Sequence, residues 1–218
     1  MALTLFYCFD AWCGWCYGFS PVVQKIAKRY ADKIAFEALS GGMILPDTPT
    51  PVSASAAYIL KAYPEVEAMT GVRFGEDYLW HLRNPDLSDW FPHSEKSAIA
   101  LSVFKEFYPS LQAEFVADLQ HALFAEGRDL TDDEAYRHLL EKYGINHVAF
   151  YEKLNAEAFR DAAHEEFAMC KQLQVTGFPT LFLQVSDLKF YLIARGYASE
   201  EQLIEIVDRL INEFDQSA

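Results

Sequence analysis

Two cysteines near the start of the chain have the spacing of a redox pair. Cys13 and Cys16 are separated by Gly14 and Trp15, and they follow the apolar run at residues 3–9. A helical periodicity of apolar residues begins directly after them, so Cys13 is predicted to lie where a strand gives way to a helix. Unpaired N–H groups and the positive end of the helix dipole stabilise a thiolate there and lower its pKa. Cys16, one turn later, can close a disulfide with Cys13 or reopen it.

A CxxC pair can also be half of a zinc site, which needs two further ligands with their own spacing. The other cysteines are Cys8 and Cys170, and neither they nor the six histidines form a second CxxC, an HxxxH or a CxxH pattern. We therefore favour disulfide chemistry and expect no metal. Cys8 lies inside the first apolar run, and we interpret it as a small buried side chain.

The chain begins with a predicted strand, helix and strand, at residues 3–9, 13–30 and 34–39. A right-handed crossover between the two strands makes them parallel. Pro21 falls inside the helical pattern and predicts a kink or a break. Glu37 lies in the second strand, where it is either a solvated edge residue or a buried acid near the cysteines. In the second case it is a candidate proton relay for thiol exchange.

The middle of the chain is helical almost throughout, and no segment there alternates like a strand. We expect residues 52–154 to form an inserted helical domain with a small core of its own. A further helix, a two-stranded antiparallel hairpin and a closing helix are predicted at residues 155–174, 181–194 and 199–214. The fold class is therefore α/β, with residues 1–51 and 155–218 forming the second domain.

This order of elements and two separated motifs resemble the DsbA family of thioredoxin-like proteins. The first motif is the Cys13–Cys16 segment, and the second is Thr-Gly-Phe-Pro-Thr at residues 176–180, which looks like the family's cis-proline loop. The similarity covers essentially the whole chain and is greatest to the cytoplasmic FrnE-like branch, whose members are predicted protein-disulfide isomerases. It implies a thioredoxin fold, a mixed sheet flanked by helices, that carries a large all-helical insertion.

The resemblance also implies a function, the exchange of disulfides with client thiols by a protein disulfide reductase or isomerase. Cys13 would be the nucleophile and Cys16 the more buried resolving thiol. The implied partners are protein or small-molecule thiols and disulfides, with no prosthetic group and with glutathione as a candidate co-substrate. We expect Trp12 and Trp15 to be exposed. The expected substrate-binding residues are Trp12, Gly14, Trp15, Phe178 and Pro179.

The dipeptide between the cysteines departs from the strongly oxidising members of this family, which have Pro-His there. Trp15 cannot stabilise a thiolate by charge as a histidine would. We therefore expect the pKa of Cys13 to be lowered less than in those members.

Composition narrows the choice of partners. The chain has 218 residues, of which 51 % are hydrophobic, and a formal net charge of −14. This charge argues against nucleic acid or an anionic membrane surface as the main partner. No run approaches the roughly 20 apolar residues of a membrane span, and the first residues lack the basic and small-residue features of a signal peptide. We expect a cytoplasmic protein, and the sequence leaves its oligomeric state open.

Two alternative functions remain. Kappa-class glutathione transferases and 2-hydroxychromene-2-carboxylate isomerases resemble this architecture and bind glutathione. They usually have a single serine or cysteine in place of the CxxC, so the intact Cys13–Cys16 pair counts against them. The other alternative is a non-enzymatic binding module, in which the helical insertion holds a partner.

Overall fold

Four strands form one mixed sheet in the order β2-β1-β3-β4 in this computed structural model, which describes residues 3–215. β1 pairs in parallel with β2 and antiparallel with β3, which in turn pairs antiparallel with β4. The predicted parallel unit and the predicted hairpin are thereby confirmed. The strands are β1 (Leu3–Phe9), β2 (Ile34–Ser40), β3 (Thr180–Ser186) and β4 (Lys189–Arg195).

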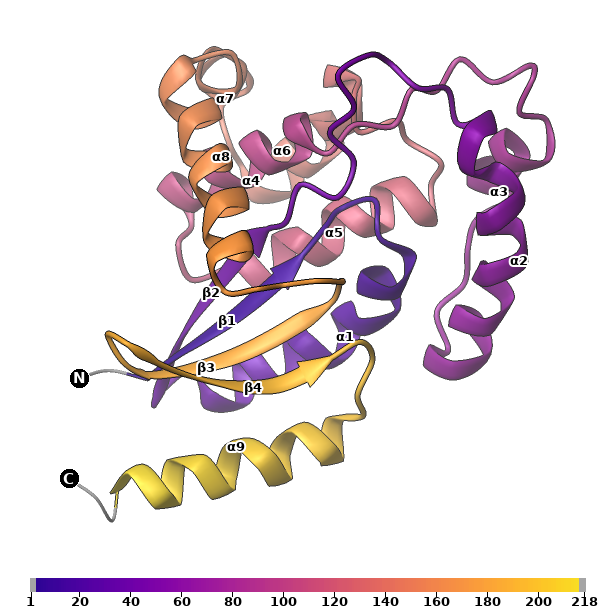
Figure 1. The fold of residues 1–218 in the computed structure, drawn as a ribbon. Helices are drawn as coiled ribbons and strands as arrows, with labels where there is room; N and C mark the ends of the chain where they lie inside the picture. Colours follow the sequence, from indigo (N-terminus) through magenta and orange to yellow (C-terminus); the bar gives the residue numbers. More distant parts are fainter. Residues whose placement is uncertain (1–2, 216–218) are drawn as a thin grey trace.

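Helices cover both faces of the sheet (Figure 1). α1 (Gly14–Tyr30) and α9 (Glu200–Asp215) pack on one face, and the C-terminal end of α8 (Glu157–Gln172) packs on the other. The side chains of β1 alternate between these layers. Tyr7 joins the core beneath α1, whereas Cys8 joins a smaller cluster beneath α8. β1 is thus buried on both faces, as its continuous apolar sequence predicts.

α1 runs without interruption through Pro21, so the predicted break does not occur. A proline in a helix removes one backbone hydrogen bond. Pro21 itself is exposed, but its neighbours Ser20, Val23 and Ile26 are buried in the core. Tertiary packing therefore holds the helix together across the missing bond.

The inserted segment is helical, as expected, but it shares the core of the rest of the molecule. Buried apolar side chains of β1, α1, α5 and α7 belong to one continuous cluster, so the expectation of a separate small core is wrong. The division at residues 52–154 stays a prediction. Residues 1–2 and 216–218, which belong to the other predicted domain, lie outside the described part. The inserted helices are α2 (Ser53–Thr70), α3 (Glu76–Arg83), α4 (Glu95–Phe107), α5 (Gln112–Phe124), the short 3₁₀ helix η1 (Asp133–Tyr136), α6 (Arg137–Tyr143) and α7 (His147–Leu154).

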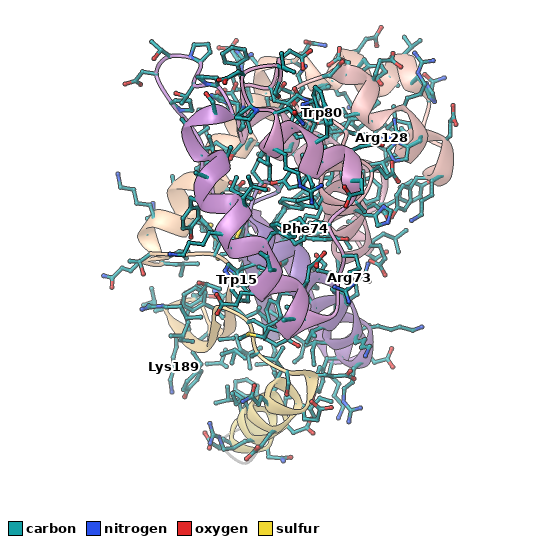
Figure 2. All side chains as sticks on the ribbon, turned by 90° about the vertical axis from the view of Figure 1, so that its right-hand side faces the viewer. Trp15, Arg73, Phe74, Trp80, Arg128 and Lys189 are labelled. Atoms are coloured by element: carbon teal, nitrogen blue, oxygen red, sulfur yellow. The ribbon has the colours of Figure 1, made fainter. Side chains whose placement is uncertain are left out.

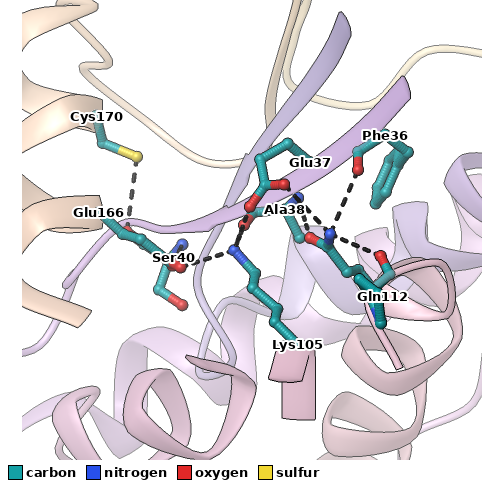
Figure 3. A network of polar contacts seen from close by, with 9 residues as sticks. Phe36, Glu37, Ala38, Ser40, Lys105, Gln112, Glu166 and Cys170 are labelled. Atoms are coloured by element: carbon teal, nitrogen blue, oxygen red, sulfur yellow. Dashed lines mark hydrogen bonds and ion pairs between the residues drawn. The ribbon is translucent and has the colours of Figure 1, made fainter. Parts of the chain in front are cut away.

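Side chains from the helices occupy the outer edge of β2 (Figure 3). The Ala38 N–H donates to Gln112 Oε1 at 2.9 Å, and Lys105 Nζ donates to the Ala38 carbonyl at 2.6 Å. The Ser40 N–H donates to Glu166 Oε2 at 2.8 Å. An open strand edge invites pairing with other chains, and these contacts cover it. Lys105 and Gln112 of the insertion, together with Glu166 of α8, therefore hold β2 in place.

Between residues 3 and 215, no helix is both long and apolar enough to cross a lipid bilayer.

Candidate active site

The two cysteines of the CxxC motif differ in depth. Cys13 is the residue at the N-terminal cap of α1, and its N–H donates to the Asp10 carbonyl at 3.1 Å. Both thiols are free; Cys13 is 7 % exposed, whereas Cys16 is fully buried one turn into the helix. Cys13 also lines a surface cavity. This order of depth is the one expected for an attacking thiol and a resolving thiol.

The two thiols also differ in acidity. A hydrogen bond from the Cys16 thiol lowers the pKa of Cys13, against the opposing effect of burial, and backbone N–H groups of Cys16 and Trp15 act in the same direction. Burial raises the pKa of Cys16 well above that of an ordinary thiol. Cys13 is therefore the first of the pair to become a thiolate, which is the form that attacks disulfides.

The proline loop lies against the first cysteine, although the two are far apart in sequence. Cys13 Sγ donates to the Phe178 carbonyl at 3.6 Å, and the Phe178–Pro179 peptide bond is cis. The Phe178 ring packs directly on the backbone of Gly41. A Cβ at Gly41 would lie 2.0 Å from Cζ of that ring, so only glycine permits this approach. The end of β2 thus supports the ring that precedes the proline.

The two tryptophans of the motif have different environments. Trp12 is 8 % exposed, its Nε1–H donates to the His93 carbonyl at 2.9 Å, and its ring meets Trp90 edge to face. The expectation that Trp12 is exposed is therefore wrong, because the inserted segment covers it and satisfies its indole N–H. Trp15 is half-buried and, with Gly14, lines the cavity beside Cys13.

Glu37 does not lie with the cysteines. Its carboxylate accepts a hydrogen bond from Lys105 Nζ at 2.5 Å and one from Gln112 Nε2 at 3.2 Å, and its side chain is 35 % exposed (Figure 3). The expectation of a buried acid beside the sulfurs is wrong for this residue, because its strand position directs it to the helices that cover the edge of β2.

The buried acid near the sulfurs is Asp10, which our sequence reasoning missed. It is 1 % exposed and accepts hydrogen bonds from the Trp12 N–H at 3.0 Å, the Met43 N–H at 2.7 Å and the Ser94 hydroxyl at 3.0 Å. Burial raises the pKa of Asp10, and its negative charge raises the pKa of both cysteines. Its position directly after a buried strand, three residues before Cys13, is the signal that could have found it.

Polar groups from α5 reach the same region. Gln120 is fully buried; its side-chain amide donates to the Asp10 carbonyl at 3.3 Å, and its carbonyl oxygen accepts a hydrogen bond from Ser20. The Tyr7 hydroxyl donates to the Cys16 carbonyl at 3.4 Å. The inserted helices therefore hold the backbone around the motif. Throughout residues 3–215, histidine, cysteine and acidic side chains form no group of three with the arrangement of metal ligands.

A cavity of about 300 Å³ opens beside Cys13. Trp15 and Phe178 line it, together with Phe74 and residues of α2. Figure 2 shows Trp15 and Phe74 on the same side of the molecule, where α2 crosses in front of the start of α1. The cavity thus gives a ligand direct access to the more acidic thiol.

The family is shown by the sequence itself. The DSBA-like thioredoxin domain matches residues 4–205 of this chain. The protein belongs to this DsbA-like family. Members of this family have a thioredoxin-like fold and are thiol-disulfide oxidoreductases, and the match covers nearly the whole chain. No curated protein sequence matches the chain significantly.

Several solved structures share the fold of this DsbA-like protein. The "putative protein disulfide isomerase from Nitrosomonas europaea" has a TM-score of 0.84 at 23 % identity, with 98 % of this chain and 99 % of that chain covered. The cytosolic disulfide reductase DsbM from Pseudomonas aeruginosa has a TM-score of 0.76 at 24 % identity, with coverage of 95 % and 98 %. A 2-hydroxychromene-2-carboxylate isomerase has a TM-score of 0.64 at 13 % identity, with coverage of 98 % and 97 %. At these identities the likeness is one of fold.

Proposed function

We propose that this DsbA-like protein reduces or isomerises disulfides of client proteins in the cytoplasm, with Cys13 and Cys16 as its redox pair. The observation that supports this most is the placement of Cys13. Its sulfur lies at the start of a helix, receives a hydrogen bond from Cys16, and faces the Phe178 carbonyl beside an open cavity. An acidic, accessible thiol with a buried partner is the arrangement that disulfide exchange requires.

The reaction proceeds in two exchanges. The Cys13 thiolate attacks one sulfur of a client disulfide, forms a mixed disulfide and releases the other client sulfur as a thiolate, which takes up a proton. Cys16 then loses its proton and attacks Cys13 Sγ. The Cys13–Cys16 disulfide forms and the second client thiol leaves, so the client gains two electrons and two protons. In isomerisation, a different thiol of the client attacks the client sulfur of the mixed disulfide instead, so a new client disulfide forms and Cys13 leaves as a thiolate.

The second exchange needs a proton acceptor for Cys16, because burial makes its thiol a weak acid. We infer that Asp10, and not the earlier candidate Glu37, accepts this proton, since Asp10 is buried and its charge acts on both sulfurs. Its own pKa is raised by burial, which makes it a better base than an exposed carboxylate.

The direction of net reaction follows from the compartment. In a reducing cytosol the resting form of such a pair is the dithiol, which favours reduction or isomerisation over net oxidation. DsbM, which shares the fold, is named a cytosolic disulfide reductase.

Insulin reduction tests the proposal. The wild type should precipitate insulin B chain in the presence of dithiothreitol, and Cys13→Ser should be inactive. Cys16→Ser should retain attack but lack resolution, so it should accumulate a mixed disulfide with insulin that is visible by mass spectrometry. Equal rates for the wild type and Cys13→Ser would contradict the proposal and favour a binding module.

A glutathione-dependent reaction is the second candidate, because DsbM has been solved with glutathione and a 2-hydroxychromene-2-carboxylate isomerase shares the fold. Such chemistry needs one cysteine only. Glutathione turnover that survives Cys16→Ser would support this candidate, and its loss together with insulin reduction would support the redox pair.

A further inference from the structure

The sulfur of Cys16 has to carry a negative charge in the second exchange, although it is fully buried. Burial raises the pKa of its thiol most, and a hydrogen bond to Cys13 and the charges of Cys13 and Asp10 raise it further. A charge that leaves water costs free energy unless hydrogen-bond donors face it. The rate of the second exchange therefore depends on the donors around this sulfur, as well as on the carboxylate that takes its proton.

Hydrogen-bond donors face Cys16 from β1 and from the turn that follows it. The Asp10 backbone N–H donates to the Cys16 sulfur and acts to lower the pKa of its thiol. Tyr7 lies in β1, beneath α1, and is fully buried. Its hydroxyl lies within hydrogen-bonding distance of the Cys16 sulfur as well as of the Cys16 carbonyl. Tyr7 is therefore a side-chain donor at the resolving thiol that the two exchanges described above do not use.

The Tyr7 hydroxyl makes only a weak bond to the carbonyl. It donates to the Cys16 carbonyl at 3.4 Å, which is long for an O–H···O hydrogen bond, normally about 2.7–2.8 Å. The same carbonyl accepts a bond from Ser20 Oγ at 3.1 Å. By contrast, the fully buried Tyr136 donates to the Leu130 carbonyl at 2.6 Å. A thiolate on Cys16 would give the Tyr7 hydroxyl a stronger acceptor than the one it has.

Tyr7 also remains a donor while the thiols ionise. Its ring stacks on that of Phe9, on the same face of β1, with ring centroids 5.4 Å apart. Burial raises the pKa of Tyr7 most, and negative charge on the nearby sulfurs of Cys16, Cys13 and Cys8 raises it further. The hydroxyl therefore keeps its proton over the pH range in which the two thiols of the motif react.

We propose that the Tyr7 hydroxyl donates a hydrogen bond to the Cys16 thiolate and thereby speeds up the second exchange. The inference rests on the proposed disulfide exchange and adds a residue to it. The proton of Cys16 passes to the Asp10 carboxylate, and the thiolate accepts the Tyr7 O–H while it attacks Cys13 Sγ. The bond between Cys13 and the client sulfur breaks, and the client leaves as a thiolate. Tyr7 itself transfers no proton.

The effect of Tyr7 should be confined to the second exchange. Cys13 has donors of its own, since the Cys16 thiol and the backbone N–H groups of Cys16 and Trp15 lower its pKa. The first exchange therefore does not need the Tyr7 hydroxyl. A residue that only supported the structure would affect both exchanges, so their separate rates distinguish the two roles.

An aromatic disulfide that releases a coloured thiolate, dithiobis-nitrobenzoate, follows both exchanges in one reaction. Mixed with an equal amount of reduced protein, it releases one thiolate when Cys13 attacks and a second when Cys16 attacks Cys13. In Tyr7→Phe the first release should keep the wild-type rate, and the second should be about tenfold slower at neutral pH. The pH midpoint of the second release should rise by about one unit, because the thiolate has lost a donor.

Tyr136→Phe is the matched control, because it removes the hydroxyl of another fully buried tyrosine, in η1 of the insertion. It should leave both releases unchanged. Cys16→Ser should release one thiolate only, which identifies the second release. In Tyr7→Phe the second rate should recover towards the wild-type value above the raised midpoint, where Cys16 ionises without help. A damaged structure would show no such recovery.

The outcomes separate the role of Tyr7 from the proposed function. Equal second releases in the wild type and Tyr7→Phe, or equal slowing of both releases at every pH, would overturn the role of Tyr7 and leave disulfide exchange intact. A single release from the wild type, or the same trace from Cys13→Ser, would instead overturn the proposed redox pair.

Discussion

At the residue scale, two identical side chains acquire different chemistry from their surroundings. Cys13 is the helix cap beside a cavity, and Cys16 is buried behind it, so one thiol becomes more acidic and the other less. The CxxC spacing predicted this pair because the spacing alone places both sulfurs on one side of a helix. It did not predict the acid beside them. The partners of Asp10 are backbone and hydroxyl groups at residues 12, 43 and 94, and only folding brings those together.

The lowered pKa of Cys13 predicts its alkylation profile. The rate of reaction with iodoacetamide, followed by mass spectrometry, should reach half its maximum at a lower pH than that of an ordinary thiol. Because the folded-state pKa is depressed, ionised Cys13 stabilises the reduced protein above the unfolded pKa. That contribution is lost as the pH falls through the folded pKa. A midpoint at or above that of a free thiol would contradict the assignment of Cys13 as nucleophile.

Asp10→Asn should lower that midpoint further, since the negative charge of Asp10 raises the pKa of Cys13. It should also destabilise the protein by about 1–3 kcal/mol, because the amide NH₂ cannot accept the hydrogen bonds that both carboxylate oxygens now receive. Asp187→Asn, in the exposed hairpin turn, is the control and should change neither quantity. An unchanged midpoint in Asp10→Asn would show that the acid does not act on the sulfur.

Gly41→Ala should reduce insulin reduction by an order of magnitude, because the added Cβ would lie 2.0 Å from the Phe178 ring and displace the loop facing Cys13. Gly177→Ala is a matched control in that loop, since a Cβ there meets nothing within 4 Å. Both rates are measured by insulin turbidity, with circular dichroism as the check of folding. Equal activity in the two variants would show that the position of Phe178 is not important.

At the scale of elements, the strands lie where the sequence predicts them. The contacts that join the strands to the helices were not predicted. The apolar run at residues 3–9 and the hairpin were predicted because alternation and turn residues are local signals. The helix side chains that cover the edge of β2 come from positions 67 or more residues away. No local pattern reports such contacts, and this is why the sequence left the surroundings of Glu37 open between the strand edge and the cysteines.

Lys105 lies at this edge of β2, and replacing it tests how much the contacts there contribute to the stability of the protein. Burial opposes its charge, but Glu166 and Glu37 outweigh burial and raise the pKa of Lys105. Lys105→Met should destabilise the protein by about 3 kcal/mol in urea titrations, because it leaves the buried carboxylate of Glu166 without its cation. Lys153→Met, which breaks an exposed pair with Glu106, should cost less than about 1 kcal/mol. Equal losses would contradict a buried role for Lys105.

The ion pair of Lys105 with Glu166 also predicts how the stability of the protein depends on pH. A raised lysine pKa contributes stability that is complete below the unfolded value of about 10.4. It is lost as the pH rises through the folded pKa. The difference in stability between the wild type and Lys105→Met should therefore shrink in strongly alkaline urea titrations, and a difference that grows with pH would contradict this sign.

At the scale of the whole molecule, the insertion and the thioredoxin part form one structure. The sequence predicted the helical insertion from its periodicity, but it could not show which helix faces meet. α5 packs on α1 and sends Gln120 to the backbone beside the redox motif. The insertion therefore contributes to the site as well as covering the sheet, and residues of its α2 line the cavity.

A shared core predicts a single unfolding transition. Tryptophan fluorescence, which reports on Trp12 and Trp15 in one part and Trp80 and Trp90 in the other, should coincide with far-UV circular dichroism in urea. Two separated transitions would show that the inserted helices are stable by themselves, which would contradict one continuous core.

The most direct test of the Cys13–Cys16 redox pair is a redox titration of the reduced protein against glutathione buffers, read by thiol alkylation and mass spectrometry. Cys13 and Cys16 should lose their thiols together in one two-electron transition, about 30 mV for each tenfold change in ratio. Cys8 and Cys170 should stay reduced across it, since both are buried away from the cavity beside Cys13. If Cys13 and Cys16 stayed reduced throughout, or were oxidised independently of each other, the redox pair would not exist.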